Sequence, residues 1–87
     1  MVNFSVEIKP PARKELEALS DRLVARVMSK VEELANTPRP PGCNKLKSFR
    51  DQWRIRVGDY RIVYIVDDSK KLVSVTRIRH RSHAYGH

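Results

Sequence analysis

The sequence predicts a single α+β domain in which an N-terminal strand and a helical hairpin precede an antiparallel meander of three or four strands. Two observations lead to this prediction: apolar and polar residues alternate from Gln52 to Val66, and apolar residues recur at helical spacing between Ala12 and Leu34. Alternation with a period of two marks a half-buried strand, whereas spacing near 3.6 marks a helix packed on one side. The 87 residues suffice for one small domain, which we expect to span residues 1–87.

The stretch QWRIRVGDYRIVYIV, residues 52–66, predicts a β-hairpin that turns at Gly58-Asp59. A two-residue loop containing glycine is typical of a type I′ or type II′ turn. This turn gathers the large apolar side chains on one face and places Arg56 opposite Arg61 on the other. Like charges directly opposite one another destabilise a sheet. Either a polyanion binds this face, or the arginines are solvated and their aliphatic stems lie over the sheet.

The other elements follow from the same two patterns. They are, in chain order, a strand over residues 2–8, helices over 12–19 and 21–36, a proline-rich loop over 37–44, a short strand or strand lead-in over 45–49, and a last strand over 72–78. Ser20 and Asp21 separate the helices and provide an N-cap. The register of the last strand stays open, because its apolar residues fall on both parities. We expect the helices to pack on one sheet face, and the first strand to take an edge or a central position beside the meander.

Composition limits the classes of partner. The net charge of +8 indicates a polyanionic binding partner: nucleic acid, an acidic protein or an anionic membrane surface. The single cysteine, Cys43, excludes a disulfide scaffold or a zinc site within one chain. Because the sequence shows no signal peptide and no long apolar run, we expect a cytoplasmic protein without a membrane span.

Two basic clusters, on the hairpin and at the C-terminus, predict phosphodiester chemistry. Guanidinium groups grip phosphates bidentately and stabilise the charge of a phosphorane. The adjacent Asp67 and Asp68 suit a turn better than a magnesium site. We therefore expect no metal and no cofactor, which favours RNA cleavage through the 2′-hydroxyl.

The order strand–helix–helix–meander, the segment WRIRVGDYRIVYIVDD and the tail RIRHRSHAY resemble the RelE/ParE superfamily of bacterial and archaeal toxins. The resemblance covers essentially the whole chain and implies a RelE-like, microbial ribonuclease-type architecture. RelE-type members are ribosome-dependent endoribonucleases that cut mRNA in the ribosomal A site without a metal. ParE-type members share the fold but poison DNA gyrase. Both types imply an antitoxin encoded in the same operon, through which the complex binds operator DNA.

Carried over position by position, the resemblance implies a catalytic set. Arg61 would stabilise the transition state, and Arg81 would help the leaving group, or Arg79 if the gap in the tail is placed differently. Tyr85 would stack on or orient the substrate. Arg56 stands where the best-known RelE pattern has a lysine proposed as general base. Because an arginine side chain stays protonated at any physiological pH, Arg56 is expected to bind phosphate instead.

Histidines offer the proton transfer that Arg56 does not. His83 is a candidate acid or base, or else a residue of a frayed tail. His80 is either part of the site or a structural histidine at a strand end. The residues expected to contact mRNA or ribosomal RNA are Arg54, Arg56, Lys45, Lys47, Arg77 and Arg79.

Three functions remain open at this level. The leading one is a RelE-type toxin that inhibits translation by cutting ribosome-bound mRNA, and the complete basic set favours it. The alternative is a ParE-like gyrase inhibitor without nuclease activity. The third is an inactive module that acts only as an antitoxin-bound co-repressor.

Overall fold

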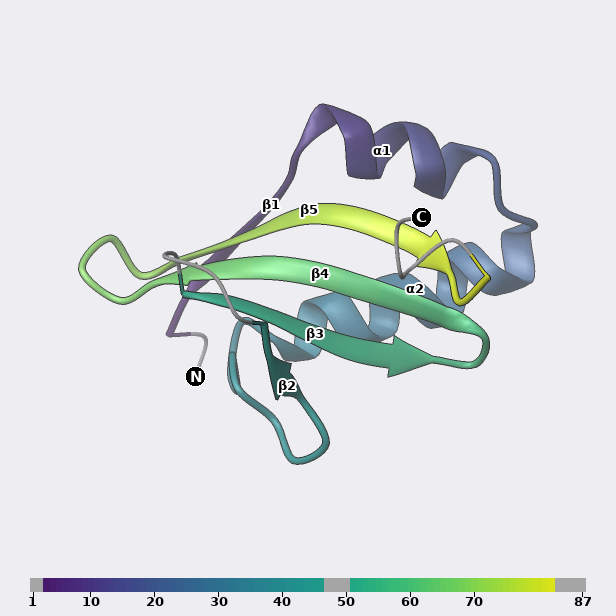
Figure 1. Cartoon of the computed structure of the whole chain (residues 1–87). Coiled ribbons are helices and arrows are strands. Elements are labelled where there is room, and N and C mark those ends of the chain that lie inside the picture. The colour runs from purple at the N-terminus through teal and green to yellow at the C-terminus, as the bar shows by residue number, and fades with distance from the viewer. Residues whose placement is uncertain (1–2, 47–50, 83–87) are drawn as a thin grey trace.

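A computed structural model describes residues 3–46 and 51–82, which form a five-stranded mixed sheet and two helices (Figure 1). In chain order the elements are β1 (Ser5–Ile8), α1 (Pro10–Glu17), α2 (Asp21–Glu33), β2 (Asn44–Lys45), β3 (Gln52–Val57), β4 (Tyr60–Asp67) and β5 (Leu72–His80). The strand order is β1-β5-β4-β3-β2. β1 runs parallel to β5, and the other neighbours are antiparallel. The predicted α+β fold and its meander are confirmed, with the first strand at an edge.

The β3–β4 hairpin has the predicted register. Val57 pairs with Tyr60, and Arg56 pairs with Arg61. Gly58 has a φ of +59°, in the left-handed region that favours glycine, whereas the φ of the following aspartate is not positive. Because a type I′ turn needs positive φ at both central residues, type II′ is the one of the two expected turns that fits.

A β-bulge in β5 explains the mixed parity of its apolar residues. Val63 pairs with Arg77, while the next residue of β4 pairs with Val75. Thr76 is therefore an extra residue, and its hydroxyl donates a hydrogen bond to the Val63 carbonyl oxygen over 3.2 Å. The bulge shifts the alternation by one residue. As a result Val75 and Ile78, which differ in parity, are both buried in the core.

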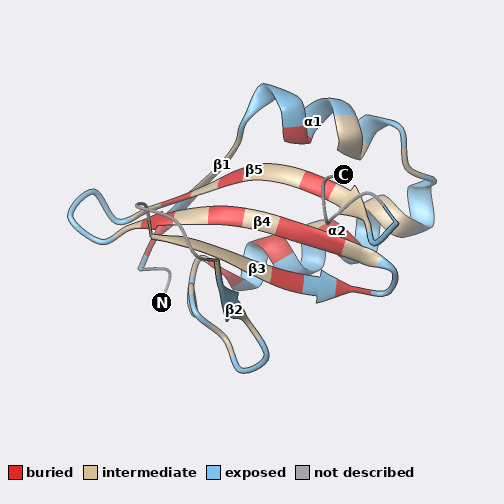
Figure 2. Ribbon diagram, in the orientation of Figure 1, coloured by how far each residue is buried: buried red, intermediate tan, exposed pale blue. Residues whose placement is uncertain are grey.

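Helix α2 covers one face of the sheet (Figure 1). The predicted N-cap is confirmed, since the Ser20 hydroxyl accepts a hydrogen bond from the Leu23 amide. Val27 and Val31 are almost fully buried, and Figure 2 shows buried residues on α2 and on the central strands. The helix ends at Glu33, before the predicted end, because the amides of the next three residues donate to carbonyl oxygens three residues back instead of four. These contacts place the core between α2 and the sheet.

Helix α1 follows the edge strand β1 and packs along β5 (Figure 1). It begins at Pro10, where the lost amide donor has no cost, and buries Ala12. At the other edge, β2 consists of Asn44 and Lys45, so it shares only Lys45 with the expected 45–49 strand, and residues 47–50 lie outside the described part of the chain. Neither described helix is long and apolar enough to cross a bilayer.

Candidate functional site

Five arginines share the sheet face that is opposite α2. Arg56 of β3 pairs with Arg61 of β4, which pairs in turn with Arg79 of β5, so three arginines form a row across three adjacent strands. A second row contains Arg54 and Arg77, which flank Val63. We call these five residues the arginine face: Arg54, Arg56, Arg61, Arg77 and Arg79. The pairing of β4 with β5 therefore brings the hairpin arginines together with Arg77 and Arg79 of the predicted C-terminal cluster.

The arginine row concentrates positive charge in a partly desolvated position. Arg61, in the middle, is only 8% exposed, whereas Arg56 is exposed. Like charges on paired strands repel, and burial of a charged group adds a desolvation cost. A bound phosphate would offset both effects. Donors fixed in this way before binding are also suited to stabilising negative charge that develops in a reaction.

Glu15 of α1 neutralises one corner of the arginine face. Its carboxylate accepts hydrogen bonds from Arg77 Nη2 and from the Ile78 amide, over 2.8 and 2.7 Å, and lies 3.9 Å from Arg79 Nε. Partial burial alone would raise the pKa of Glu15, but the hydrogen bonds from Arg77 and Ile78 outweigh it and hold this pKa below its usual value. The hydrogen bond to Glu15 also raises the pKa of Arg77. Arg77 is thus held by α1, although the sequence predicted an RNA-binding role.

A pocket of about 240 Å³ opens beside the arginine row. It is lined by Arg54, Arg56 and Arg61 of the sheet together with Gly42 and Asn44. The proline-rich loop and the start of β2 therefore contribute to its wall. The position of this loop decides the shape of the pocket.

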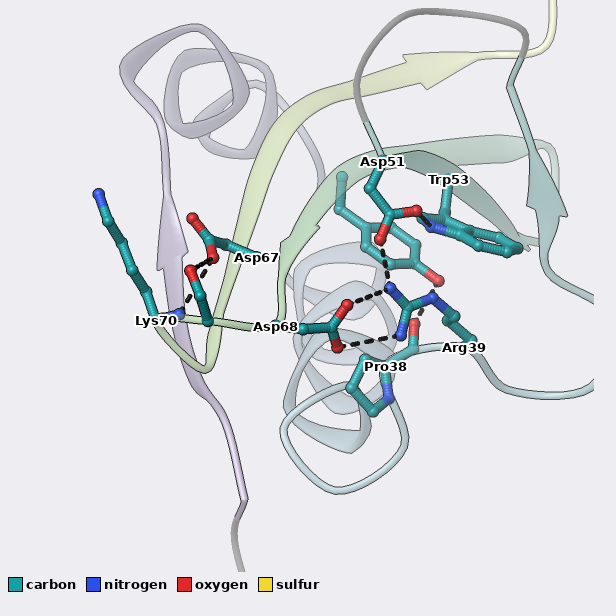
Figure 3. Close-up of polar contacts among 9 residues, drawn as sticks. Pro38, Arg39, Asp51, Trp53, Asp67, Asp68 and Lys70 are labelled. Carbon is teal, nitrogen blue, oxygen red and sulfur yellow. Dashed lines mark hydrogen bonds and ion pairs between the residues drawn. The ribbon is translucent and has the colours of Figure 1, made fainter.

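Arg39 anchors the proline-rich loop to the sheet. Figure 3 shows its guanidinium between Asp51, which precedes β3, and Asp68, which follows β4. The same guanidinium lies over the ring of Trp53, and the Trp53 indole N–H donates to Asp51. Tyr64 reaches the loop from the core, and its hydroxyl donates to the Pro38 carbonyl over 2.7 Å. These contacts fix one end of the loop that lines the pocket.

Electrostatics support this anchor. The hydrogen bond from Arg39 holds the pKa of Asp68 below its usual value, and that bond also raises the pKa of Arg39. Asp67 accepts hydrogen bonds from the Ser69 hydroxyl and the Lys70 amide, which lowers its pKa. The Asp67 side chain therefore stabilises the turn that follows β4, as predicted, while Asp68 pairs with Arg39. Within residues 3–46 and 51–82, no three His, Cys, Asp or Glu side chains are grouped to hold a metal.

The structure separates Arg79 from Arg81. Arg79 belongs to the arginine row, whereas Arg81 lies beyond β5, where its amide donates to the Asp59 carbonyl over 2.7 Å. The side chain of Arg81 is 69% exposed, and its Nε lies 4.0 Å from an Asp59 carboxylate oxygen. His80 contacts the Tyr60 ring edge-on, and its Nδ1 lies 2.9 Å from the Ser82 hydroxyl. These contacts keep His80 at the strand end, beside the hairpin turn.

The remaining predicted site residues are at the periphery or outside the described residues. The Lys45 ammonium lies over the Trp53 ring, beside the proline-rich loop. Lys47, His83 and Tyr85 fall outside the described part of the chain. Their predicted roles therefore stay predictions.

Sequence reasoning missed Glu15 and Arg39. Glu15 meets Arg77 across 62 residues of sequence, and Arg39 meets Asp68 across 29. Neither residue lies in a recognisable motif, and each looks like an ordinary surface charge in its own segment. Only the pairing of distant elements shows their roles.

Comparisons with known proteins identify the family of this chain. Residues 6–85 match the sequence profile of the family described as "ParE toxin of type II toxin-antitoxin system, parDE". Toxin RelE of Mycobacterium tuberculosis is 30% identical over 83 residues, which cover 94% of this chain and 86% of that protein. Toxin RelG of the same organism is 28% identical and covers 94% and 95%.

A solved structure shows the same architecture. RelE in the archaeal RelE–RelB complex from Pyrococcus horikoshii superimposes with a TM-score of 0.83 at 26% identity, over 94% of this chain and 99% of that one. The profile match extends over nearly the whole chain. The chain therefore belongs to the RelE/ParE superfamily, the toxins of type II toxin–antitoxin systems.

Proposed function

We propose that this toxin is a RelE-type endoribonuclease that cuts mRNA in the ribosomal A site, without a metal, and so inhibits translation. The arginine row Arg56–Arg61–Arg79 is the observation that carries the proposal, because it aligns three arginines on adjacent strands, and two of them, Arg56 and Arg61, line an open pocket. Such a row suits a scissile phosphodiester. The RelE names of the relatives in sequence support the same reading.

In this proposal the ribose 2′-hydroxyl attacks the adjacent phosphorus, and the P–O5′ bond breaks. Arg61 binds the non-bridging oxygens and stabilises the added charge of the phosphorane. Arg56 holds the phosphate from β3, and Arg79 lies on the other side of Arg61, within reach of the leaving oxygen. His83 remains the candidate for proton transfer, and Tyr85 for stacking on the base. The site itself then supplies orientation and electrostatic stabilisation, while the tail supplies the proton donor or acceptor.

The proposed partners follow from the relatives. The Pyrococcus horikoshii RelE and the Escherichia coli RelE were each crystallised with RelB. We accordingly expect a cognate antitoxin from the same operon, which neutralises this chain and carries the complex to operator DNA. Action on ribosomes and mRNA places the proposed activity in the cytoplasm.

A cleavage assay with and without programmed ribosomes tests the proposal. The native chain should cut A-site mRNA only when ribosomes are present. Replacement Arg61→Ala should lower the rate by about 100-fold or more, as removal of a single oxyanion donor does in other enzymes. The control Arg13→Ala changes an exposed arginine on α1 and should leave the rate near native. Intact A-site mRNA after incubation with the native chain would refute the ribonuclease function.

The description of the matching family as a ParE toxin supports a second candidate function. A ParE-type toxin would stabilise gyrase–DNA cleavage complexes and would leave mRNA intact. Incubation of the native chain with gyrase and supercoiled DNA distinguishes the two functions. We expect no accumulation of cleaved DNA.

A further inference from the structure

We propose that the RNA path does not end at the arginine face but continues around the edge of β3 to a row of cations on α2. This inference rests on the proposed function, because it names where RNA that flanks the scissile phosphate binds. The bound group is the phosphate backbone of single-stranded RNA.

Three pockets that share lining residues follow this path, and together we call them the groove. The pocket beside Arg61 shares Gly42, Ile55 and Arg56 with the next pocket, and that one shares Lys30 and Arg56 with a third. The third pocket lies between α2 and the hairpin turn and is lined by Arg26 and Gly58. Arg56 lines all three pockets. The groove therefore joins the sheet face to the helix.

The path around the edge is open because β2 pairs only with the first half of β3. Asn44 and Lys45 pair with Arg54 and Trp53, so β2 leaves the segment from Ile55 to Val57 uncovered. On the sheet face opposite the arginine face, helix α2 contacts β3. A linear ligand can thus pass from the sheet face to α2 without crossing a strand.

The charge of the groove is strongly one-sided. Five cations line the three pockets, namely Arg26, Lys30, Arg54, Arg56 and Arg61, against one carboxylate, Glu33. Glu33 Oε1 lies 4.0 Å from Lys30 Nζ. Within the described residues, Arg26 and Arg56 join none of the ion pairs, in contrast to Arg77 and Arg39. This imbalance favours a polyanion.

The α2 cations have a regular spacing. Arg22, Arg26 and Lys30 recur every four residues on one exposed stripe, which places them about 6 Å apart along the helix. The Arg26 guanidinium reaches the hairpin turn, since a Cβ built on Gly58 would be 3.5 Å from Arg26 Nη1. Ala25 and Ser29 also line this end of the groove, and their small side chains allow a ligand backbone to approach closely. The stripe continues the arginine face in charge and in space.

Salt-dependent binding tests the inference. The probe is a fluorescent 2′-O-methyl oligouridylate, which cannot be cut, so binding is measured whether or not the chain is a ribonuclease. Each phosphate contact with a single strand contributes about 0.7 to the slope of log affinity against log salt. The double variant R26A/K30A should therefore lower the magnitude of that slope by up to about 1.4. The matched control R13A/K14A removes two exposed charges from α1 and should leave the slope unchanged.

Several outcomes would overturn the inference. Equal slopes for native and R26A/K30A protein would show that RNA does not reach α2, and equal losses in both double variants would show only diffuse attraction. Polyglutamate binding that depends on Arg26 and Lys30 as strongly as RNA binding would assign the groove to an acidic protein. The charge-retaining R26K/K30R should bind like the native chain, and thermal unfolding should show that all variants are folded. A correct slope change without A-site cleavage would support the groove and refute the proposed function.

Discussion

Arg61 combines burial with positive neighbours on both sides. It is 8% exposed and pairs across the sheet with Arg56 and Arg79. The alternation of the hairpin was sufficient to predict the Arg56–Arg61 pair. It did not show that Arg79 completes the row, because that needs the register of β5. The cost of this arrangement is explained if it is part of the phosphate site.

Replacement of Arg56 separates binding from stability. Arg56→Gln keeps a polar side chain and the first carbons of its aliphatic stem but removes a charge opposite Arg61. We expect the free energy of unfolding to stay the same or to rise by up to about 1 kcal/mol, since like-charged cross-strand pairs are destabilising. RNA cleavage should fall sharply. Urea unfolding and the ribosome assay measure the two effects, with Arg13→Gln as the control.

The opposite result would assign the arginine face a structural role. In that case Arg56→Gln would lose more than about 1 kcal/mol of stability and would still cleave mRNA.

Glu15 provides a pH-dependent test. Its pKa in the folded chain is below 4.5, so its stabilising contribution is present at neutral pH and is lost as the pH falls through the lowered value. Glu15→Gln should therefore destabilise the chain by about 1–2 kcal/mol near pH 7, the value of charged hydrogen bonds that are partly exposed. The gap should narrow as the pH falls below 4.5 and should close once the pH is below the lowered pKa of Glu15.

The exposed Glu17, on the same helix, is the matched control. Unfolding of the native chain, Glu15→Gln and Glu17→Gln by urea across this pH range measures the effect. A stability gap for Glu15→Gln that persists at low pH would contradict the assigned interaction.

At the level of elements, local sequence patterns predicted the strands and turns well. They predicted less well which residues pair between neighbouring strands. The hairpin register followed from Gly58-Asp59 and from alternation alone, since the turn fixes every later pair. The bulge at Thr76 did not, although the mixed parity of β5 was its visible trace. The position of the extra residue is determined by how β5 pairs with β4. The residue pattern of a single strand holds no information about that pairing.

The proline-rich loop is the element on which the pocket depends, and Arg39 is its anchor. Arg39→Gln removes the guanidinium from Asp51 and Asp68 and should free the loop to open. The side chain of Arg39 is about one-third exposed, so we expect a modest cost of about 1 kcal/mol. That cost corresponds to an about fivefold rise in local opening.

Cys43 reports this opening directly, because it is the single cysteine, lies in the loop and packs partly against the core. Its labelling rate with a thiol reagent should rise about fivefold in Arg39→Gln. Arg22→Gln, which changes an exposed arginine on α2, should label at the native rate. Equal rates in the native chain and in Arg39→Gln would show that Arg39 does not hold the loop.

For the whole molecule, the sequence predicted the fold and the basic character of the site, but not what shapes the site. The order of elements and the meander followed from periodicity. The contacts of Glu15 with β5, and of Arg39 with Asp51 and Asp68, link segments that no local pattern relates. The same holds for the groove from Arg61 to α2, which exists only once α2 lies beside β3.

One substitution in the mRNA tests whether the proposed cleavage in the A site proceeds through the ribose 2′-hydroxyl. Ribosomes are programmed with an all-ribose mRNA, or with the same mRNA carrying a single 2′-deoxynucleotide at the scissile position. We expect cleavage of the first mRNA, with a 2′,3′-cyclic phosphate on the upstream product, and no cleavage of the second. Equal cleavage of both mRNAs would exclude attack by the 2′-hydroxyl, and cleavage of neither would refute the ribonuclease activity.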